Sequence, residues 1–188
     1  MRPPAAVFLW SRVGGPGHDS CRLFELAREW RLRGVAVFAE ARRACELHYE
    51  VTADRAFRTK SARVAGFIGT ERVDVRIEAL RGGGWTVDGK PRPSLAECVD
   101  VDLGFTPATN LIVLRRLGLR VGELAEAPAA YLAFPSLRVG VLPQRYERRS
   151  RTDYAYASPN HGYRATLRVS PIGAVVDYPG LFRSVRVR

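Results

Sequence analysis

The chain of 188 residues contains little lysine, methionine, histidine or cysteine, and it has no long apolar run. A helix that crosses a membrane needs about 18 or more apolar residues in succession, and no such stretch is present. The apolar run near the start ends at Ser11 after six residues, which is short for the core of a secretory signal. We therefore expect no membrane span and a cytoplasmic location.

The three cysteines are Cys21, Cys45 and Cys98. Their number is odd and no CxxC spacing occurs, whereas a disulfide framework usually shows an even set. The three histidines, His18, His48 and His161, form no HExxH motif, and no four-ligand zinc set is visible. These absences predict reduced thiols, no metal site and no cofactor.

Catalytic sequence motifs are also missing. There is no GxSxG elbow and no GxGxxG loop, and the glycine-rich segment 14–17 lacks the Lys and Ser that a phosphate-binding Walker loop requires. Whether the protein is an enzyme therefore stays open, and the absence of these motifs favours a non-enzymatic role.

The net charge of +11 rests almost entirely on arginine, since 28 of the 30 basic residues are Arg. Residues 141–188 hold nine basic and three acidic residues, with a cluster at Arg145, Arg148, Arg149 and Arg151. Clustered arginine is typical of surfaces that bind nucleic acid or other anions. The same bias, together with abundant Ala, Gly and Val, is typical of a GC-rich genome, so the charge alone does not identify a partner.

Apolar residues alternate with polar ones along much of the chain. Residues 73–79 give the clearest half-buried strand, and Asp88-Gly89 is a strong hairpin signal. Further short strands are predicted over residues 5–10, 35–38, 47–51, 57–67, 85–87, 129–134, 137–142, 154–157, 163–169, 174–178 and 185–187. For Asp19–Arg33 the spacing of Leu23, Leu26 and Trp30 fits a helix, but a pair of strands is an open alternative.

The densest polar group lies in the middle of the chain. Asp100 and Asp102 are two residues apart, so on a strand both side chains point to one face. Paired carboxylates can perform acid–base work, or they can be structural, with one of them bound to Arg115 or Arg116. Thr109 or Asn110 is expected to cap a short helix over residues 111–117.

Aromatic residues are frequent in the predicted strands. Tyr154 and Tyr156 share a strand face, and the later tyrosines alternate with arginines. Such residues can stack bases, line an apolar cavity with a polar mouth, or simply pack the core.

Several of these segments together resemble the bacterial "putative glycolipid-binding" family, which was formerly a domain of unknown function. The most specific part runs from Asp100-Val-Asp102 through Thr106-Pro107-Ala-Thr109-Asn110 to Arg115-Arg116. Supporting segments are Trp85, Leu47–Val51, Phe57–Thr59, Tyr131–Pro135, Gln144–Tyr146, Tyr154–Tyr156 and Asp177–Gly180. The chain departs from the family pattern at Phe57, where Trp is more frequent, and at Ala108, where Phe is frequent.

The resemblance implies a mainly β, single-domain spiral β-roll over residues 1–188, with many antiparallel strands, one or two short helices and a likeness to lipoprotein-carrier folds. It further implies non-enzymatic binding of a lipid-like or glycolipid-like ligand on a curved sheet. From the resemblance and the polar and aromatic groups we expect these ligand-binding residues: Trp85, Asp100, Asp102, Thr106, Asn110, Arg115, Arg116, Tyr146 and Tyr178.

Two other functions stay open at this point. One is an enzyme that acts on a sugar or phosphate ester, with Asp100, Asp102, Asn110 and Arg115 in a polar pocket. The other is a nucleic-acid binder that uses the basic, aromatic C-terminal third.

Overall fold

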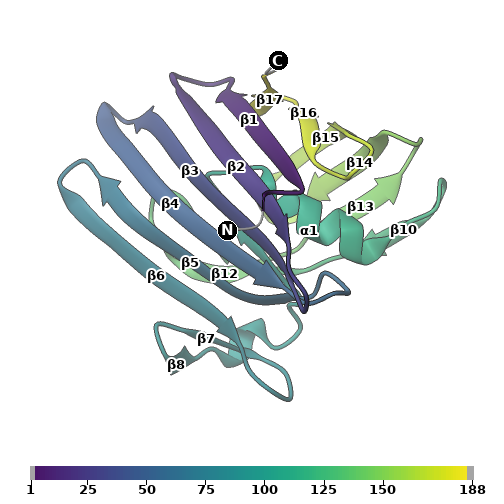
Figure 1. Ribbon diagram of the computed structural model, residues 1–188, viewed down its shortest axis with the longest axis horizontal. Helices are drawn as coiled ribbons and strands as arrows, with labels where there is room; N and C mark the ends of the chain where they lie inside the picture. Colours follow the sequence, from purple (N-terminus) through teal and green to yellow (C-terminus); the bar gives the residue numbers. More distant parts are fainter. Residues whose placement is uncertain (1–2, 186–188) are drawn as a thin grey trace.

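The computed structural model describes residues 3–185 and consists mainly of β-strands (Figure 1). One sheet has fourteen strands, and every hydrogen-bonded neighbour pair in it is antiparallel. In spatial order these strands are β10 (Leu124–Glu126), β13 (Arg145–Arg148), β14 (Asp153–Ser158), β15 (Tyr163–Val169), β16 (Val175–Tyr178), β17 (Phe182–Ser184), β1 (Ala6–Arg12), β2 (Gly17–Glu25), β3 (Trp30–Glu40), β4 (Arg43–Ala53), β5 (Thr59–Ile68), β6 (Glu71–Ala79), β7 (Trp85–Val87) and β8 (Lys90–Pro91).

A second, smaller sheet and one α-helix complete the fold. The small sheet has the order β12 (Val139–Leu142), β11 (Ala129–Leu132) and β9 (Asp100–Leu103), and its β9–β11 pair is parallel. The helix α1 covers Ala108–Leu117, and two 3₁₀ turns, η1 and η2, cover Pro93–Leu95 and Pro159–His161. The expectation of a mainly β fold with one or two short helices is confirmed.

The large sheet has one buried face because side chains alternate along its strands. Five residues in register across β2–β6 point inward: Cys21, Gly34, Tyr49, Val64 and Val75. Their neighbours along the strands carry mostly charged side chains on the outer face: Arg22, Arg33, Glu50, Arg63 and Arg76. This alternation fixes which face of the sheet packs against the rest of the molecule.

The helix and the small sheet fill the inside of the curled sheet. Figure 1 shows α1 between the wall formed by β1–β6 and the wall that contains β13–β15. The ring of Phe105 packs edge-on against Tyr49 of β4 at 5.8 Å and against Phe134 at 6.1 Å. Phe134 in turn packs against Phe38 of β3 at 5.2 Å. The concave face is therefore part of a packed core.

Three local predictions are decided by the structure. The segment Asp19–Arg33 belongs to the strand pair β2–β3, so its helical alternative is wrong. The helix begins at Ala108 and no side chain caps it, so the expected cap at Thr109 or Asn110 is wrong. The hairpin at Asp88-Gly89 is confirmed, with positive φ angles of 50° and 75° at its two turn residues.

The last predicted strand, residues 185–187, falls largely outside the described residues, and β17 ends at Ser184. Among residues 3–185, no helix combines the length and the apolar character needed to cross a membrane.

Candidate functional site

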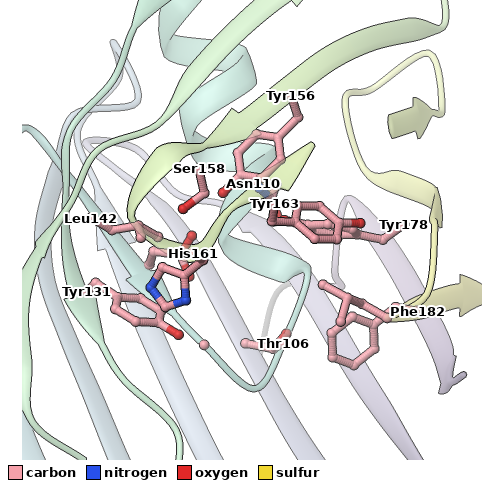
Figure 2. Close-up of a pocket in the computed structure, with 13 residues that line it drawn as sticks. Thr106, Asn110, Tyr131, Leu142, Tyr156, Ser158, His161, Tyr163, Tyr178 and Phe182 are labelled. Carbon is pink, nitrogen blue, oxygen red and sulfur yellow. The ribbon is translucent and has the colours of Figure 1, made fainter. Parts of the chain in front are cut away.

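A half-open pocket of about 270 Å³ lies where the later strands of the large sheet meet the small sheet and α1 (Figure 2). Residues from many separate elements line it, so only the complete fold forms it. Its lining residues are Asp102, Gly104, Thr106, Asn110, Tyr131, Leu142, Tyr156, Ser158, His161, Tyr163, Tyr178, Leu181 and Phe182.

Aromatic rings form much of the pocket wall. The rings of Tyr156, Tyr163 and Tyr178 contact one another, with centroid separations between 5.7 and 6.1 Å. On another side of the pocket His161 lies edge-on to Tyr131 at 5.5 Å, and Figure 2 shows these two rings next to each other. Aromatic faces with polar edges suit a ligand that is neither fully apolar nor fully charged.

Polar side chains are held at fixed positions in the same pocket. Asn110 of α1 donates a hydrogen bond from Nδ2 to the hydroxyl of Tyr146 at 2.9 Å. Gln144 donates from Nε2 to Oδ2 of Asp102 at 2.5 Å and to the hydroxyl of Tyr156 at 3.2 Å. The hydroxyl of Ser158 is buried and has no hydrogen-bond partner within residues 3–185. An unpaired buried hydroxyl of this kind is free to bond a ligand.

Asp102 is the acidic group of the pocket. Partial burial raises the pKa of its carboxyl to about 6, although the bond from Gln144 opposes the shift. The charge of the nearby Asp100 raises the same pKa further. Near neutral pH the carboxyl is thus close to its titration point, and it can accept or donate a hydrogen bond to a ligand hydroxyl.

A second buried acid lies behind the pocket wall. Thr106 lines the pocket, and its hydroxyl donates to Oδ2 of Asp19 on β2. Tyr49 on β4 donates to the same carboxylate at 2.9 Å and 3.0 Å. Burial raises the pKa of Asp19 to about 7, and the bonds from Thr106 and Tyr49 only partly oppose the shift. This cluster connects the pocket to the centre of the large sheet.

Comparison with known proteins shows which family the chain belongs to. The family model described as "Putative glycolipid-binding" matches residues 7–184 of the chain. The chain belongs to this family. The match confirms the resemblance that the central motif and the aromatic strands carry.

One solved structure is similar to this chain over nearly the whole length of both proteins. It is the crystal structure of a DUF1089 family protein from Pseudomonas aeruginosa, with a TM-score of 0.77 and 26% sequence identity. The alignment covers 97% of this chain and 94% of that chain. A search of curated proteins gave no match.

Four of the nine residues expected to bind ligand line the pocket of the family protein: Asp102, Thr106, Asn110 and Tyr178. A fifth, Tyr146, lies fully buried behind the wall and holds Asn110 in place. The structure thus brings together five of the nine expected residues, drawn from β9, α1, β13 and β16 and the segment before α1.

The other four expected residues lie elsewhere. The indole of Trp85 is buried and donates to the carbonyl of Cys98 at 2.9 Å. Arg116 binds Asp100 through two nitrogens, from Nε at 2.9 Å and 3.0 Å and from Nη2 at 2.5 Å. Arg115 points away toward the ring of Phe57. Asp100 and Arg116 therefore form the structural ion pair that was the alternative to catalysis. Of the four polar residues in the enzyme hypothesis, only Asp102 and Asn110 line the pocket, whereas Asp100 and Arg115 do not.

Several pocket residues were not among the expected ligand-binding residues. Tyr131, Tyr156 and Tyr163 belong to the aromatic set, but nothing in the sequence separates pocket tyrosines from core tyrosines. His161 sits in the turn η2, and its sequence neighbours Asn160 and Gly162 indicate only a turn. These residues share a pocket because of strand pairing between distant segments, which leaves no short-range signal.

The basic C-terminal cluster is largely bound to the protein itself. Arg149 pairs with Glu147 at 2.8 Å, and Arg145 lies 3.9 Å from Glu126. Arg148 donates three hydrogen bonds to backbone carbonyls. Within residues 3–185, no group of three or more His, Cys, Asp or Glu side chains is arranged to hold a metal ion.

Proposed function

We propose that this protein binds an amphipathic, glycolipid-like ligand and that the pocket holds the sugar-like head group. The observation that supports the proposal best is the mixed lining of the pocket. Contacting rings of Tyr156, Tyr163 and Tyr178 line the same pocket as the fixed polar groups of Asp102 and Asn110. Aromatic faces pack against the apolar faces of a sugar ring, while carboxyl and amide groups bond its hydroxyls.

The size of the pocket supports a head group rather than whole acyl chains. Its volume of about 270 Å³ is at or below the roughly 300–1,000 Å³ that is usual for small-molecule pockets. The concave face of the large sheet is occupied by α1 and the small sheet, so acyl chains have no deep groove there. We place the start of the acyl part at the pocket mouth, along the exposed side chain of Leu181.

A cytoplasmic location is part of the proposal. Its support is the three cysteines, all of which are buried and free of disulfide bonds. Unpaired thiols are usual in a reducing compartment.

The first experiment looks for a natural ligand. Native mass spectrometry of freshly purified protein, followed by organic extraction, should find a co-purifying amphipathic molecule. Octyl β-glucoside below its micelle concentration then serves as the probe, with free glucose and octanoate as the two partial probes. We expect octyl glucoside to bind more tightly than either partial probe and to shift the amide signals of Gly104 and His161 in NMR spectra.

Paired variants test whether the pocket is the binding site. Asp102→Asn and Tyr163→Ala remove a pocket carboxylate and a pocket ring. Asp74→Asn and Phe67→Ala make the same changes on the outer face, where both residues are accessible. We expect pocket variants to weaken octyl glucoside binding at least fivefold, because a lost hydrogen bond or aromatic contact costs about 1 kcal/mol or more. Equal affinity of pocket and outer-face variants would refute the proposal.

A further inference from the structure

A second cavity, separate from the ligand pocket, lies beside the C-terminal end of α1. It has a volume of about 210 Å³. Its lining residues are Phe57, Leu114, Arg115, Gly118, Arg148, Arg151, Tyr154, Val169, Ser170, Pro171 and Gly173. Asn110 faces the first pocket and Leu114 the second, so about 6 Å of helix separates the two positions.

Three arginines line this cavity and no acidic residue does. Within residues 3–185, none of Arg115, Arg148 and Arg151 forms an ion pair with a carboxylate, whereas Arg116, Arg120, Arg149 and Arg168 each do. Three positive charges around a small space attract an anion into it. The lack of a protein anion at this position is the main reason to expect a bound one.

Arg148 is held in a fixed position in the wall of the cavity. The guanidinium of Arg148 donates to the carbonyls of Leu119, Ser150 and Arg151 at 2.7, 3.1 and 3.2 Å. These three bonds leave two of its five N–H groups for another acceptor. The same guanidinium lies 5.6 Å from the ring centre of Tyr154, a wall residue of the cavity.

Arg115 is held in place although it is exposed. Its guanidinium lies 5.1 Å from the ring centre of Phe57, and this ring stacks on Trp30 at 4.9 Å. The stem of Arg115 passes over Gly173, where an added Cβ would lie 3.5 Å from its Cδ. Among residues 3–185 no acceptor binds the Arg115 guanidinium, so its N–H groups are available to a ligand.

The hydroxyl of Ser170 adds a neutral donor to the lining. Its Oγ accepts a hydrogen bond from the backbone N–H of Ala174 at 3.2 Å. The O–H proton of Ser170 is therefore free to donate in another direction. Guanidinium forks and a hydroxyl on several sides of a small cavity match the geometry of a phosphate group with its several acceptor oxygens.

We propose that this cavity, lined by Arg115, Arg148, Arg151 and Ser170, is a binding site for a phosphate group. The ligand class is a phosphate monoester, whose dianionic group lies between the arginines while its organic part extends toward the open side of the cavity. The site does not depend on the glycolipid pocket, and each proposal can fail without the other.

The test uses inorganic phosphate and glycerol 1-phosphate as soluble probes, followed by NMR of the Gly118, Ser170 and Gly173 amides. Vesicles of phosphatidylcholine with and without phosphatidic acid form a separate arm. Binding of the soluble probes indicates a free phosphate ester, and binding only to vesicles that contain phosphatidic acid indicates a lipid head group. Both outcomes support the site, provided that the variants below weaken the binding.

The variants are Arg115→Gln, Arg151→Gln and the double variant, which leave the backbone contacts of Arg148 intact. The control is Arg138→Gln, which removes one positive charge from an exposed residue that does not line the cavity. We expect each site variant to weaken binding about tenfold or more, because a hydrogen bond to a charged group contributes roughly 1.5–3 kcal/mol. Octyl glucoside binding should not change in these variants. No binding of any phosphate probe, or equal weakening by Arg138→Gln, would overturn the proposal.

Discussion

At the scale of single residues, one glycine makes room for the buried polar cluster behind the pocket. Gly34 on β3 lies directly opposite Tyr49 on β4. An added Cβ at Gly34 would lie 2.2 Å from Cζ of Tyr49 and 2.3 Å from its hydroxyl oxygen. The ring of Tyr49 therefore passes over Gly34 to reach the carboxylate of Asp19. The absence of one methyl group thus permits a hydrogen-bond network that spans β2, β4 and the segment before α1.

The substitution Gly34→Ala should destabilise the protein by about 1–3 kcal/mol, as is usual when a well-packed core receives an extra methyl group. Tyr49 is buried and bonded at its tip, so it cannot move aside without losing those bonds. Gly140→Ala on β12 is the control, because nothing lies within 4 Å of its added Cβ. Urea denaturation measures both. Equal stability of the two variants would show that Tyr49 does not need the space above Gly34.

The buried ion pair of Asp100 and Arg116 shows how residue types alone leave a role undecided. Two aspartates two residues apart are compatible with catalysis or with structure. Asp100 is fully buried and receives its bonds from Arg116, whereas Asp102 reaches the pocket and Gln144. The spacing predicts a shared strand face, but the position of the helix that carries Arg116 decides which carboxylate is bound by an arginine and which faces the pocket.

At the scale of elements, α1 and β13 meet at the bond between Asn110 and Tyr146. The helix starts without a side-chain cap, although the hydroxyl of Thr106 accepts the N–H of Ala108 at 3.0 Å. Asn110 thus sits inside the first turn and points its amide toward β13 and the pocket. This hydrogen bond fixes the direction of a pocket side chain, while the buried apolar residues of α1 hold the helix in the core.

Tyr146→Phe should lower the free energy of unfolding by about 1–2 kcal/mol, because the buried amide of Asn110 loses its acceptor. It should also weaken octyl glucoside binding if Asn110 contacts the head group. Tyr154→Phe is the matched control, since no hydrogen bond of the Tyr154 hydroxyl is present within residues 3–185. Denaturant titration and calorimetry measure the two effects. A loss of stability as large in the control would contradict the assigned role of Tyr146.

Strands with local signals were predictable, and elements fixed by distant contacts were not. The alternation in residues 73–79 and the Asp88-Gly89 turn depend only on neighbouring residues, and both predictions are confirmed. In Asp19–Arg33 the helical spacing competes with pairing to β1 and β4, and nine register pairs between β2 and β3 make the segment a strand pair. Local propensity is weaker than such a set of tertiary contacts.

At the scale of the whole molecule, the family resemblance predicted the fold class, whereas the order of the strands determines which residues line the pocket. The central motif supplies Asp102, Thr106 and Asn110 to the pocket. Tyr156, Tyr163 and Tyr178 come from β14, β15 and β16, which the order of the large sheet places beside the motif. Since this order depends on pairing across the whole chain, the sequence identifies the polar half of the pocket better than its aromatic half.

The two buried acids predict that the protein loses stability as the pH rises. The carboxyls of Asp19 and Asp102 have pKa values of about 7 and about 6. In the unfolded chain an aspartate titrates near 3.9. Between roughly pH 4 and pH 7 the folded state therefore binds more protons than the unfolded state, and stability falls with rising pH in this window. For Asp19 the shift corresponds to a loss on the order of 4 kcal/mol, complete above its folded pKa.

The variant Asp19→Asn tests this sign directly. Its amide is neutral at every pH, and its carbonyl can still accept from Tyr49. We expect the variant to flatten the decline of stability between pH 5 and pH 8 and to melt above the unsubstituted protein at pH 8. Asp74→Asn is the control, because Asp74 is on the outer face and the bonds from Arg63 lower its pKa. It should leave the slope between pH 5 and pH 8 unchanged. Parallel stability curves for Asp19→Asn and the unsubstituted protein would mean that Asp19 stays ionised in the folded state. The Thr106–Asp19–Tyr49 cluster would then carry a charge directly behind the ligand pocket.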